Sequence, residues 1–272
     1  MFKRLMLYEN VKSSLEQLTI LLILITSIQL GFGQTFTLIP TDIIGVNYSS
    51  VNWVDYDNDG DLDIFITGST DSWHGPGVTK IYQNNNGIFN EVSVGLNIGI
   101  WESSTEWGDY DNDVALDILF TGKAGSSFLW GIYHNDNGNF SFGGRLPNIL
   151  YGSASWGDYD NDGDLDILLA GWDVSNSEPN TYITKIYCND NGNFNDISAG
   201  LTGVKYAGVA WGDYDNDGDL DIIISGSSNT SPYGDITLIY RNDNGNFTNI
   251  NAGLRGGPQK LDNSLGVNSG LI

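Results

Sequence analysis

Hydrophobic residues fall in short runs separated by polar turns, a pattern typical of an all-β protein. In residues 208–250, such runs predict strands at 208–213, 220–225, 236–240 and 246–250. The second of these runs is almost continuously apolar, which indicates a strand buried on both faces. An Asn-Gly pair between the last two runs predicts a tight hairpin, because both central residues of a type I′ turn need positive φ. No helical periodicity occurs after residue 33.

This pattern occurs four times along the chain. Each copy contains a tryptophan just before an aspartate-rich segment, and the copies lie about 50 residues apart. We expect these tryptophans, Trp53, Trp107, Trp156 and Trp211, to pack between neighbouring repeats. Four short strands in such a repeat are the content of one β-propeller blade. We therefore predict an all-β β-propeller of four-stranded antiparallel blades, with four repeats present at about 41–92, 93–142, 143–198 and 199–250.

The two ends of the chain differ from the repeats. Basic residues precede an apolar run at 18–28, and the small residues Gly31 and Gly33 follow it. This order predicts a secretory signal peptide over residues 1–33, because the run is well short of the ~20 residues that span a bilayer. We expect a mature chain over 34–272 that is secreted or held at the extracellular surface, with repeats to residue 250, a C-terminal tail at 251–272 and no transmembrane segment.

Charge limits the class of partner. The formal net charge of −23 argues against nucleic acid, which needs a basic surface, and favours cations or neutral ligands. The aromatic content of 12% is too high for an acidic disordered chain. Cys188, the only cysteine, has no partner for an intramolecular disulfide, and we interpret it as a small packing residue. It shares one repeat position with Gln83, His134 and Arg241, and the alternation of the strand predicts an exposed site there.

The aspartate-rich segments have the form D-x-D-x-D-G-x-x-D, which suits a hard cation in a tight loop. We expect carboxylates at positions 1, 3, 5 and 9 and the backbone carbonyl at position 7 to converge on one ion, while glycine at position 6 permits the reversal. An all-oxygen cage favours Ca²⁺ over Mg²⁺ and Zn²⁺. The sequence therefore predicts up to four Ca²⁺ ions, with ligands drawn from Asp55, Asp57, Asp59, Asp61, Asp63, Asp109, Asp111, Asp113, Asp117, Asp158, Asp160, Asp162, Asp164, Asp166, Asp213, Asp215, Asp217, Asp219 and Asp221.

The second loop departs from this form, because Val114 replaces the glycine and Ala115 the following aspartate. A β-branched residue with positive φ is strained, so we expect this site to bind more weakly. None of the loops is an EF-hand. Position 12, where an EF-hand has glutamate, is apolar in all four, and no flanking helices are expected.

The aspartate loop, preceded by a Trp-Gly pair and followed by Leu-Asp-Ile, resembles the FG-GAP/VCBS repeats and is similar to those of integrin α-subunit propellers. The resemblance covers residues 36–250. It implies blades of a propeller, commonly with about seven blades, in adhesion proteins, lectins and some polysaccharide-degrading enzymes. With four repeats here, three arrangements stay open: part of a larger ring, a ring closed by association of copies, and an open fragment.

A candidate ligand face lies opposite the calcium loops, where Trp73, Trp101 and Trp172 occur in loops that join other strands. Exposed aromatic side chains suit sugar stacking or a protein hot spot, although they can equally cover blade edges. Motifs for nucleophilic, zinc or phosphate chemistry are missing from the sequence, so we expect no enzyme. The leading hypothesis is a calcium-binding module for adhesion or recognition. The alternatives are a carbohydrate-binding lectin and a noncatalytic part of a polysaccharide lyase or hydrolase.

Overall fold

The hydrophobic runs form sixteen strands in the part of the chain that the computed structural model describes. The chain divides into two units, residues 1–40 and 41–272, and only residues 38–39 of the first are described. The described residues are 38–39, 41–71, 76–96, 98–125, 127–144, 146–175, 181–230 and 234–254. The predicted signal peptide and the tail beyond residue 254 lie outside them. Among these residues no helix is long and apolar enough for a membrane span.

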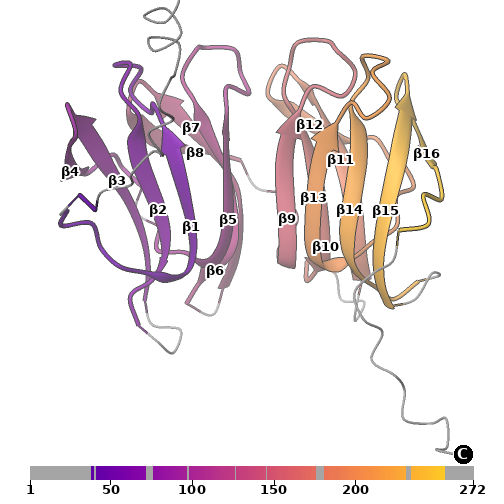
Figure 1. Ribbon diagram of the computed structural model, residues 1–272, viewed down its shortest axis with the longest axis horizontal. Helices are drawn as coiled ribbons and strands as arrows, with labels where there is room; N and C mark the ends of the chain where they lie inside the picture. The colour runs from indigo at the N-terminus through magenta and orange to yellow at the C-terminus, as the bar shows by residue number, and fades with distance from the viewer. Residues whose placement is uncertain are drawn as a thin grey trace, which may run out of the picture. The chain divides into compact units, whose positions relative to one another are not determined.

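Four antiparallel sheets of four strands each make up the second unit (Figure 1). We call them blades 1 to 4. Blade 1 contains β1 (Asn47–Val54), β2 (Asp63–Ser69), β3 (Gly77–Asn85) and β4 (Ile88–Val92). Blade 2 contains β5 (Trp101–Gly108), β6 (Asp117–Ala124), β7 (Ser127–Asp136) and β8 (Asn139–Gly144). Blade 3 contains β9 (Ile149–Gly157), β10 (Asp166–Asp173), β11 (Thr181–Asp190) and β12 (Asn193–Asp196). Blade 4 contains β13 (Lys205–Gly212), β14 (Asp221–Ser228), β15 (Gly234–Asp243) and β16 (Asn246–Asn249).

Within each blade, strands that follow one another in sequence are paired in space. The third and fourth strands are joined by the predicted Asn-Gly turns, whose asparagines have positive φ at Asn86, Asn137, Asn191 and Asn244. First strands of successive blades lie next to one another. The predicted fold is therefore confirmed as an all-β, propeller-like succession of blades, and the succession is not closed into a ring.

Each first strand contains a β-bulge at the same repeat position, which the sequence pattern does not reveal. The register of pairing with the second strand shifts there in all four blades. The bulged residues have φ between 47° and 52° and are Tyr48, Glu102, Tyr151 and Tyr206. Since none of them is glycine, the surrounding sheet must hold the backbone in this uncommon conformation.

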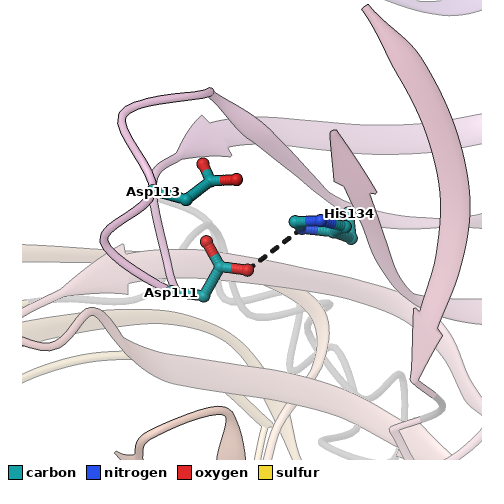
Figure 2. Close-up of side chains that lie close together, drawn as sticks. All are labelled: Asp111, Asp113 and His134. Carbon is teal, nitrogen blue, oxygen red and sulfur yellow. Dashed lines mark ion pairs between the residues drawn. The ribbon is translucent and has the colours of Figure 1, made fainter. Parts of the chain in front are cut away.

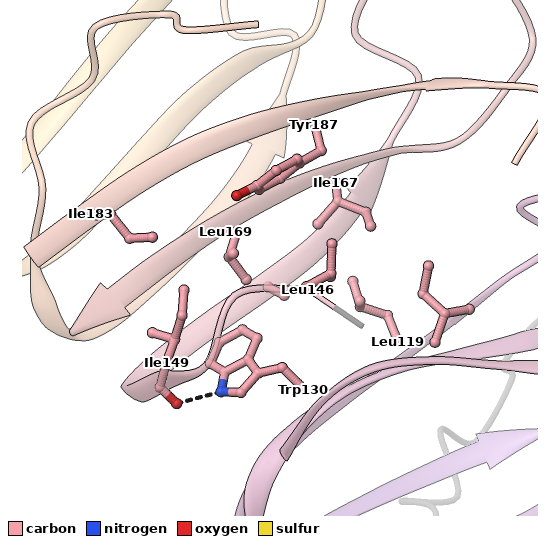
Figure 3. Packing of buried hydrophobic residues seen from close by; sticks show 10 residues of the cluster. Leu119, Trp130, Leu146, Ile149, Ile167, Leu169, Ile183 and Tyr187 are labelled. Atoms are coloured by element: carbon pink, nitrogen blue, oxygen red, sulfur yellow. Dashed lines mark hydrogen bonds between the residues drawn. The ribbon is translucent and has the colours of Figure 1, made fainter. Parts of the chain in front are cut away.

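The hydrophobic core consists of layers between consecutive blades. Second strands lie in the middle of these layers, and every residue of β2 is buried. Between blades 2 and 3, Leu119 and Trp130 pack with Ile149, Ile167 and their neighbours (Figure 3). The Trp130 indole N–H also donates a hydrogen bond to the Ile149 carbonyl. Apolar side chains on both faces of a sheet explain the continuous hydrophobic runs of the sequence.

Polar contacts near the first strands differ from one interface to the next. Between blades 1 and 2, the Thr105 hydroxyl donates to the Asn52 side chain at 2.6 Å. Between blades 2 and 3, the Glu106 carboxylate accepts from the backbone N–H of Trp156 at 2.9 Å. Burial raises the pKa of Glu106 above its usual range. These two interfaces thus carry different polar pairs.

The repeated tryptophans pack between blades, as their position before the aspartate loops suggests, with one exception. Trp156 stacks on Tyr110 of blade 2, and Trp211 stacks on Tyr159 of blade 3. Trp53 is 62% exposed, so the expectation that it fills a blade interface is wrong. The described residues contain no blade before the first for Trp53 to pack on.

Candidate metal sites

Each aspartate loop connects the first and second strands of its blade and is folded by its own carboxylates. The carboxylate at position 1 accepts hydrogen bonds from the backbone N–H groups at positions 5 and 6. In the first loop these bonds run from Asp59 and Gly60 to Asp55 at 3.0 and 3.1 Å. Position 5 in turn accepts from the N–H at position 7. These bonds bend the backbone into a tight coil.

The carboxylate at position 9 is the first residue of the second strand and is buried in every blade. Its two oxygens accept hydrogen bonds from two backbone N–H groups, which in blade 3 are those of Tyr159 at 3.0 Å and Asn189 at 2.8 Å. Burial raises the pKa of Asp166 to about 7 and that of Asp117 to about 6. In both cases desolvation outweighs the two hydrogen bonds, which lower the pKa. A nearby cation would favour the charged form of these carboxylates.

Three carboxylates converge in every loop. Oxygens from positions 1, 3 and 9 lie within 4.8 Å of one another in four sets: Asp55, Asp57 and Asp63; Asp109, Asp111 and Asp117; Asp158, Asp160 and Asp166; and Asp213, Asp215 and Asp221. Desolvation and neighbouring carboxylates raise the pKa of Asp111 and Asp160. Like charges held this close favour the binding of a cation.

The remaining predicted ligands have other partners. Position 5, occupied by Asp59, Asp113, Asp162 and Asp217, is held by its bond to the N–H at position 7. At position 7, the Asp164 side chain accepts from Asn112, and the Asp219 side chain accepts from Asn161 and Asn244. The Asp61 N–H bonds to position 5 like its counterparts. In loops 3 and 4, the side chain at position 7 therefore does not join the carboxylates at positions 1, 3 and 9. This agrees with a ligand role for the backbone carbonyl of position 7 alone.

The second loop differs in its backbone and in its surroundings. Val114 has φ of 80°, the strained conformation expected of it, while Gly60, Gly163 and Gly218 take this position in the other loops. His134 on β7 extends into the loop, where its Nδ1 lies 3.0 Å from Asp111 (Figure 2). The same nitrogen lies 3.3 Å from Asp117. Asp111, Asp113 and His134 together form a further group of converging ligand atoms. This loop therefore combines nitrogen and oxygen donors.

The repeat position of His134 contacts the loops in other blades too, a role that sequence reasoning missed. We expected an exposed strand site there, and this expectation is wrong. Gln83 donates a hydrogen bond to Asp57 at 2.6 Å, and the Cys188 thiol lies 3.9 Å from Asp160. In blade 4, Arg241 pairs with Asp243 instead. These four residues occupy the same repeat position on the third strands, beside the hairpin that faces the loops. This shared position was the sequence signal that could have predicted the contact.

The candidate ligand face differs from the prediction in which aromatic residues it exposes. Trp101 is buried beneath Lys123, whose Nζ lies 4.7 Å from the ring centroid, so its expected exposure is wrong. Trp172 is partly exposed and has Lys205 at 5.9 Å. Trp73 lies outside the described residues. Among the described residues, the exposed aromatics of this region include Tyr151 and Tyr206 of the β-bulges, whose ring centroids are 4.7 Å apart.

Comparison with protein families finds three overlapping matches to the FG-GAP-like repeat, at residues 55–120, 109–169 and 158–224. Each match runs from one aspartate loop into the second strand of the following blade. Comparison with curated proteins finds no significant match.

Proposed function

Because the chain belongs to the FG-GAP-like repeat family, we propose that it is a calcium-binding β-propeller-type module that recognises a protein or glycan ligand outside the cell. The observation that carries the calcium proposal is the convergence of three carboxylates in every loop. The buried carboxylate at position 9 is central, because burial raises its pKa in blades 2 and 3 and a bound cation would favour its charged form.

In loops 1, 3 and 4, positions 1, 3 and 9 would hold the ion through carboxylate oxygens. Bound Ca²⁺ supplies positive charge and a flexible shell of oxygen ligands. Position 1 belongs to the residue that follows the first strand, and position 9 opens the second strand. An ion bound by both positions would hold the first and second strands of a blade together, so we assign the metal a structural role.

Loop 2 is proposed as the weaker calcium site. Val114 places its backbone in a strained conformation, and His134 lies within 3.3 Å of two of the candidate ligands. An imidazole nitrogen is a poor ligand for Ca²⁺ and competes for the same carboxylates.

Recognition is assigned to the face opposite the loops. Tyr151 and Tyr206 are exposed there beside Lys123 and Lys205, and this combination of rings and polar groups suits a sugar or a protein loop. A lectin is the second candidate, and the exposed pair of adjacent tyrosine rings favours it. A noncatalytic part of a polysaccharide lyase or hydrolase is the third. We propose no enzymatic activity.

Calcium titration by calorimetry, with thermal unfolding in calcium and in EDTA, tests the metal proposal. We expect EDTA to lower the melting temperature, since a ligand that binds only the folded state stabilises it. Asp160→Asn should remove one binding site. Asp164→Asn, in the same loop, should keep it, because its side chain lies outside the converging set. Unchanged stability in EDTA, or equal effects of the two substitutions, would refute the proposed site. A glycan array then separates the lectin from a protein-binding module.

A further inference from the structure

The interfaces between blades are built from repeated contacts. Trp156 packs over Gly108 and stacks on Tyr110 with ring planes 3° apart. Trp211 packs over Gly157 and stacks on Tyr159 in the same way, at 11°. In each case the later blade contributes the tryptophan, and the earlier blade contributes a glycine and a tyrosine from the end of its first strand.

Two kinds of hydrogen bond accompany this stacking. An asparagine on the third strand of the later blade donates to the tyrosine carbonyl of the earlier one. These bonds are Asn135 to Tyr56 at 2.8 Å, Asn189 to Tyr110 at 2.7 Å, and Asn242 to Tyr159 at 3.0 Å. The asparagine at loop position 4 of the earlier blade donates to the next loop, from Asn58, Asn112 and Asn161. All three interfaces contain both bonds.

Blade 4 presents the earlier half of this interface without a partner among the described residues. A Cβ atom at Gly212 would meet nothing within 4 Å, and Tyr214 is 48% exposed. Ile223 is 42% exposed, whereas its counterparts Leu119 and Leu168 are 1% and 0% exposed because the next blade covers them.

Blade 1 presents the later half. Trp53 and Leu62 are exposed, and the Asn84 amide bonds to the Leu62 carbonyl of its own blade. The segment at residues 43–46 covers Ile66 and Tyr82 on this face. It leaves Trp53 open, and it corresponds to the linker at 201–204, since Ile44 and Thr202 each donate to a third-strand tyrosine.

We propose that blade 4 of one copy of this chain docks on blade 1 of a second copy, with Trp53 seated over Gly212 and Tyr214. Asn84 of one copy then donates to the Tyr214 carbonyl of the other, and Asn216 reaches loop 1. The contact is heterologous, because it joins two different surfaces. Two copies satisfy both open faces and make a ring of eight blades, within the range of about four to eight that propellers adopt.

Sedimentation velocity of the full chain tests this pairing, with Trp53→Ala and Gly212→Val as variants. The native chain should show a species of twice the chain mass. Each variant should raise the dissociation constant by about thirtyfold or more, as expected when a central tryptophan anchor is lost or its seat is filled. Ile88→Ala, an exposed apolar change on the outer strand β4, is the control and should leave association unchanged.

Mixing the two variants gives the decisive measurement. Trp53→Ala retains an intact blade 4 face, and Gly212→Val retains an intact blade 1 face, so the mixture should regain a pair that neither forms alone. Circular dichroism of each variant at low concentration verifies that the fold is intact. A native chain that stays monomeric, a pair that both variants keep, or a mixture that fails to associate would overturn the proposal.

Discussion

Gly157 offers a direct test of the blade interface, because it lies directly beneath the Trp211 ring. A Cβ atom at this position would be 2.6, 2.7 and 2.8 Å from three atoms of the indole. The φ angle of Gly157 is not positive, so alanine is compatible with its backbone conformation. The destabilising part of the effect of Gly157→Ala therefore comes from packing and not from backbone strain.

The expected size of the effect follows from these distances. To reach ordinary contact, the ring must retreat by roughly 0.8 Å within a closely packed layer, and such overpacking costs about 1–3 kcal/mol. The lower entropy of the unfolded alanine chain offsets about 0.4–1 kcal/mol. We expect a net loss of about 1–2 kcal/mol in the free energy of unfolding. Gly212→Ala is the matched control, since it makes the same change at the same repeat position without a ring above it.

Urea denaturation followed by tryptophan fluorescence measures both variants, at a protein concentration low enough to keep copies apart. Gly157→Ala should lower the denaturation midpoint, and Gly212→Ala should leave it unchanged or raise it slightly. If the two substitutions shift the midpoint alike, the close packing of Trp211 over Gly157 is not what holds blades 3 and 4 together.

Three further predictions concern the hydrogen bonds, the second loop and pH. Asn242→Ala should destabilise the fold by about 1–3 kcal/mol more than Asn84→Ala, because both asparagines bond two backbone groups of their own blade but only Asn242 also bonds the carbonyl of Tyr159 in the preceding blade; urea midpoints check this, and equal losses would contradict it. Val114→Gly should stabilise the metal-free protein by about 1 kcal/mol by relieving the positive-φ strain, and should strengthen calcium binding, as measured by calorimetry. Calcium affinity at loop 3 should fall as pH drops through 7, because the raised pKa of Asp166 makes protons compete with the ion there. Calcium titrations at about pH 8 and pH 6 check this, and an affinity that does not change between them would count against it.

Most of the fold could be predicted from the sequence because it is repetitive. Four copies of one pattern of strands and turns reinforce each other, and the predicted strand at 220–225 overlaps β14 from residue 221 onward. The β-bulges escaped prediction, since Tyr48, Tyr151 and Tyr206 give no local signal of positive φ. The exposure of Trp53 was also not predicted, because the residues of a blade do not indicate whether another blade lies next to it.

The candidate site was predicted well where ligands are close in sequence and poorly where they are distant. Positions 1, 3 and 9 lie in one loop, and their convergence follows from a local turn. The approach of His134 to Asp111 depends on the pairing of β6 with β7, which brings a hairpin to the loop. Trp101 was misplaced for a similar reason, since its burial depends on Lys123 from the neighbouring strand.

The separate polar pairs at the first strands bear on how the chain avoids misfolding. Blades with similar hydrophobic cores could exchange neighbours during folding, a common hazard in repeat proteins. Glu106 accepts from the backbone N–H of Trp156 and from the side chain of Ser155, both in blade 3. Every blade offers a backbone N–H at this position, but the residue equivalent to Ser155 is Asn52, Glu106 or Ala210 in the other blades. With Ala210 of blade 4 in that place, the buried carboxylate would lose one of its donors, at a cost of about 1–3 kcal/mol. The contact of Glu106 with blade 3 therefore favours blade 3 over blade 4 as the neighbour of blade 2.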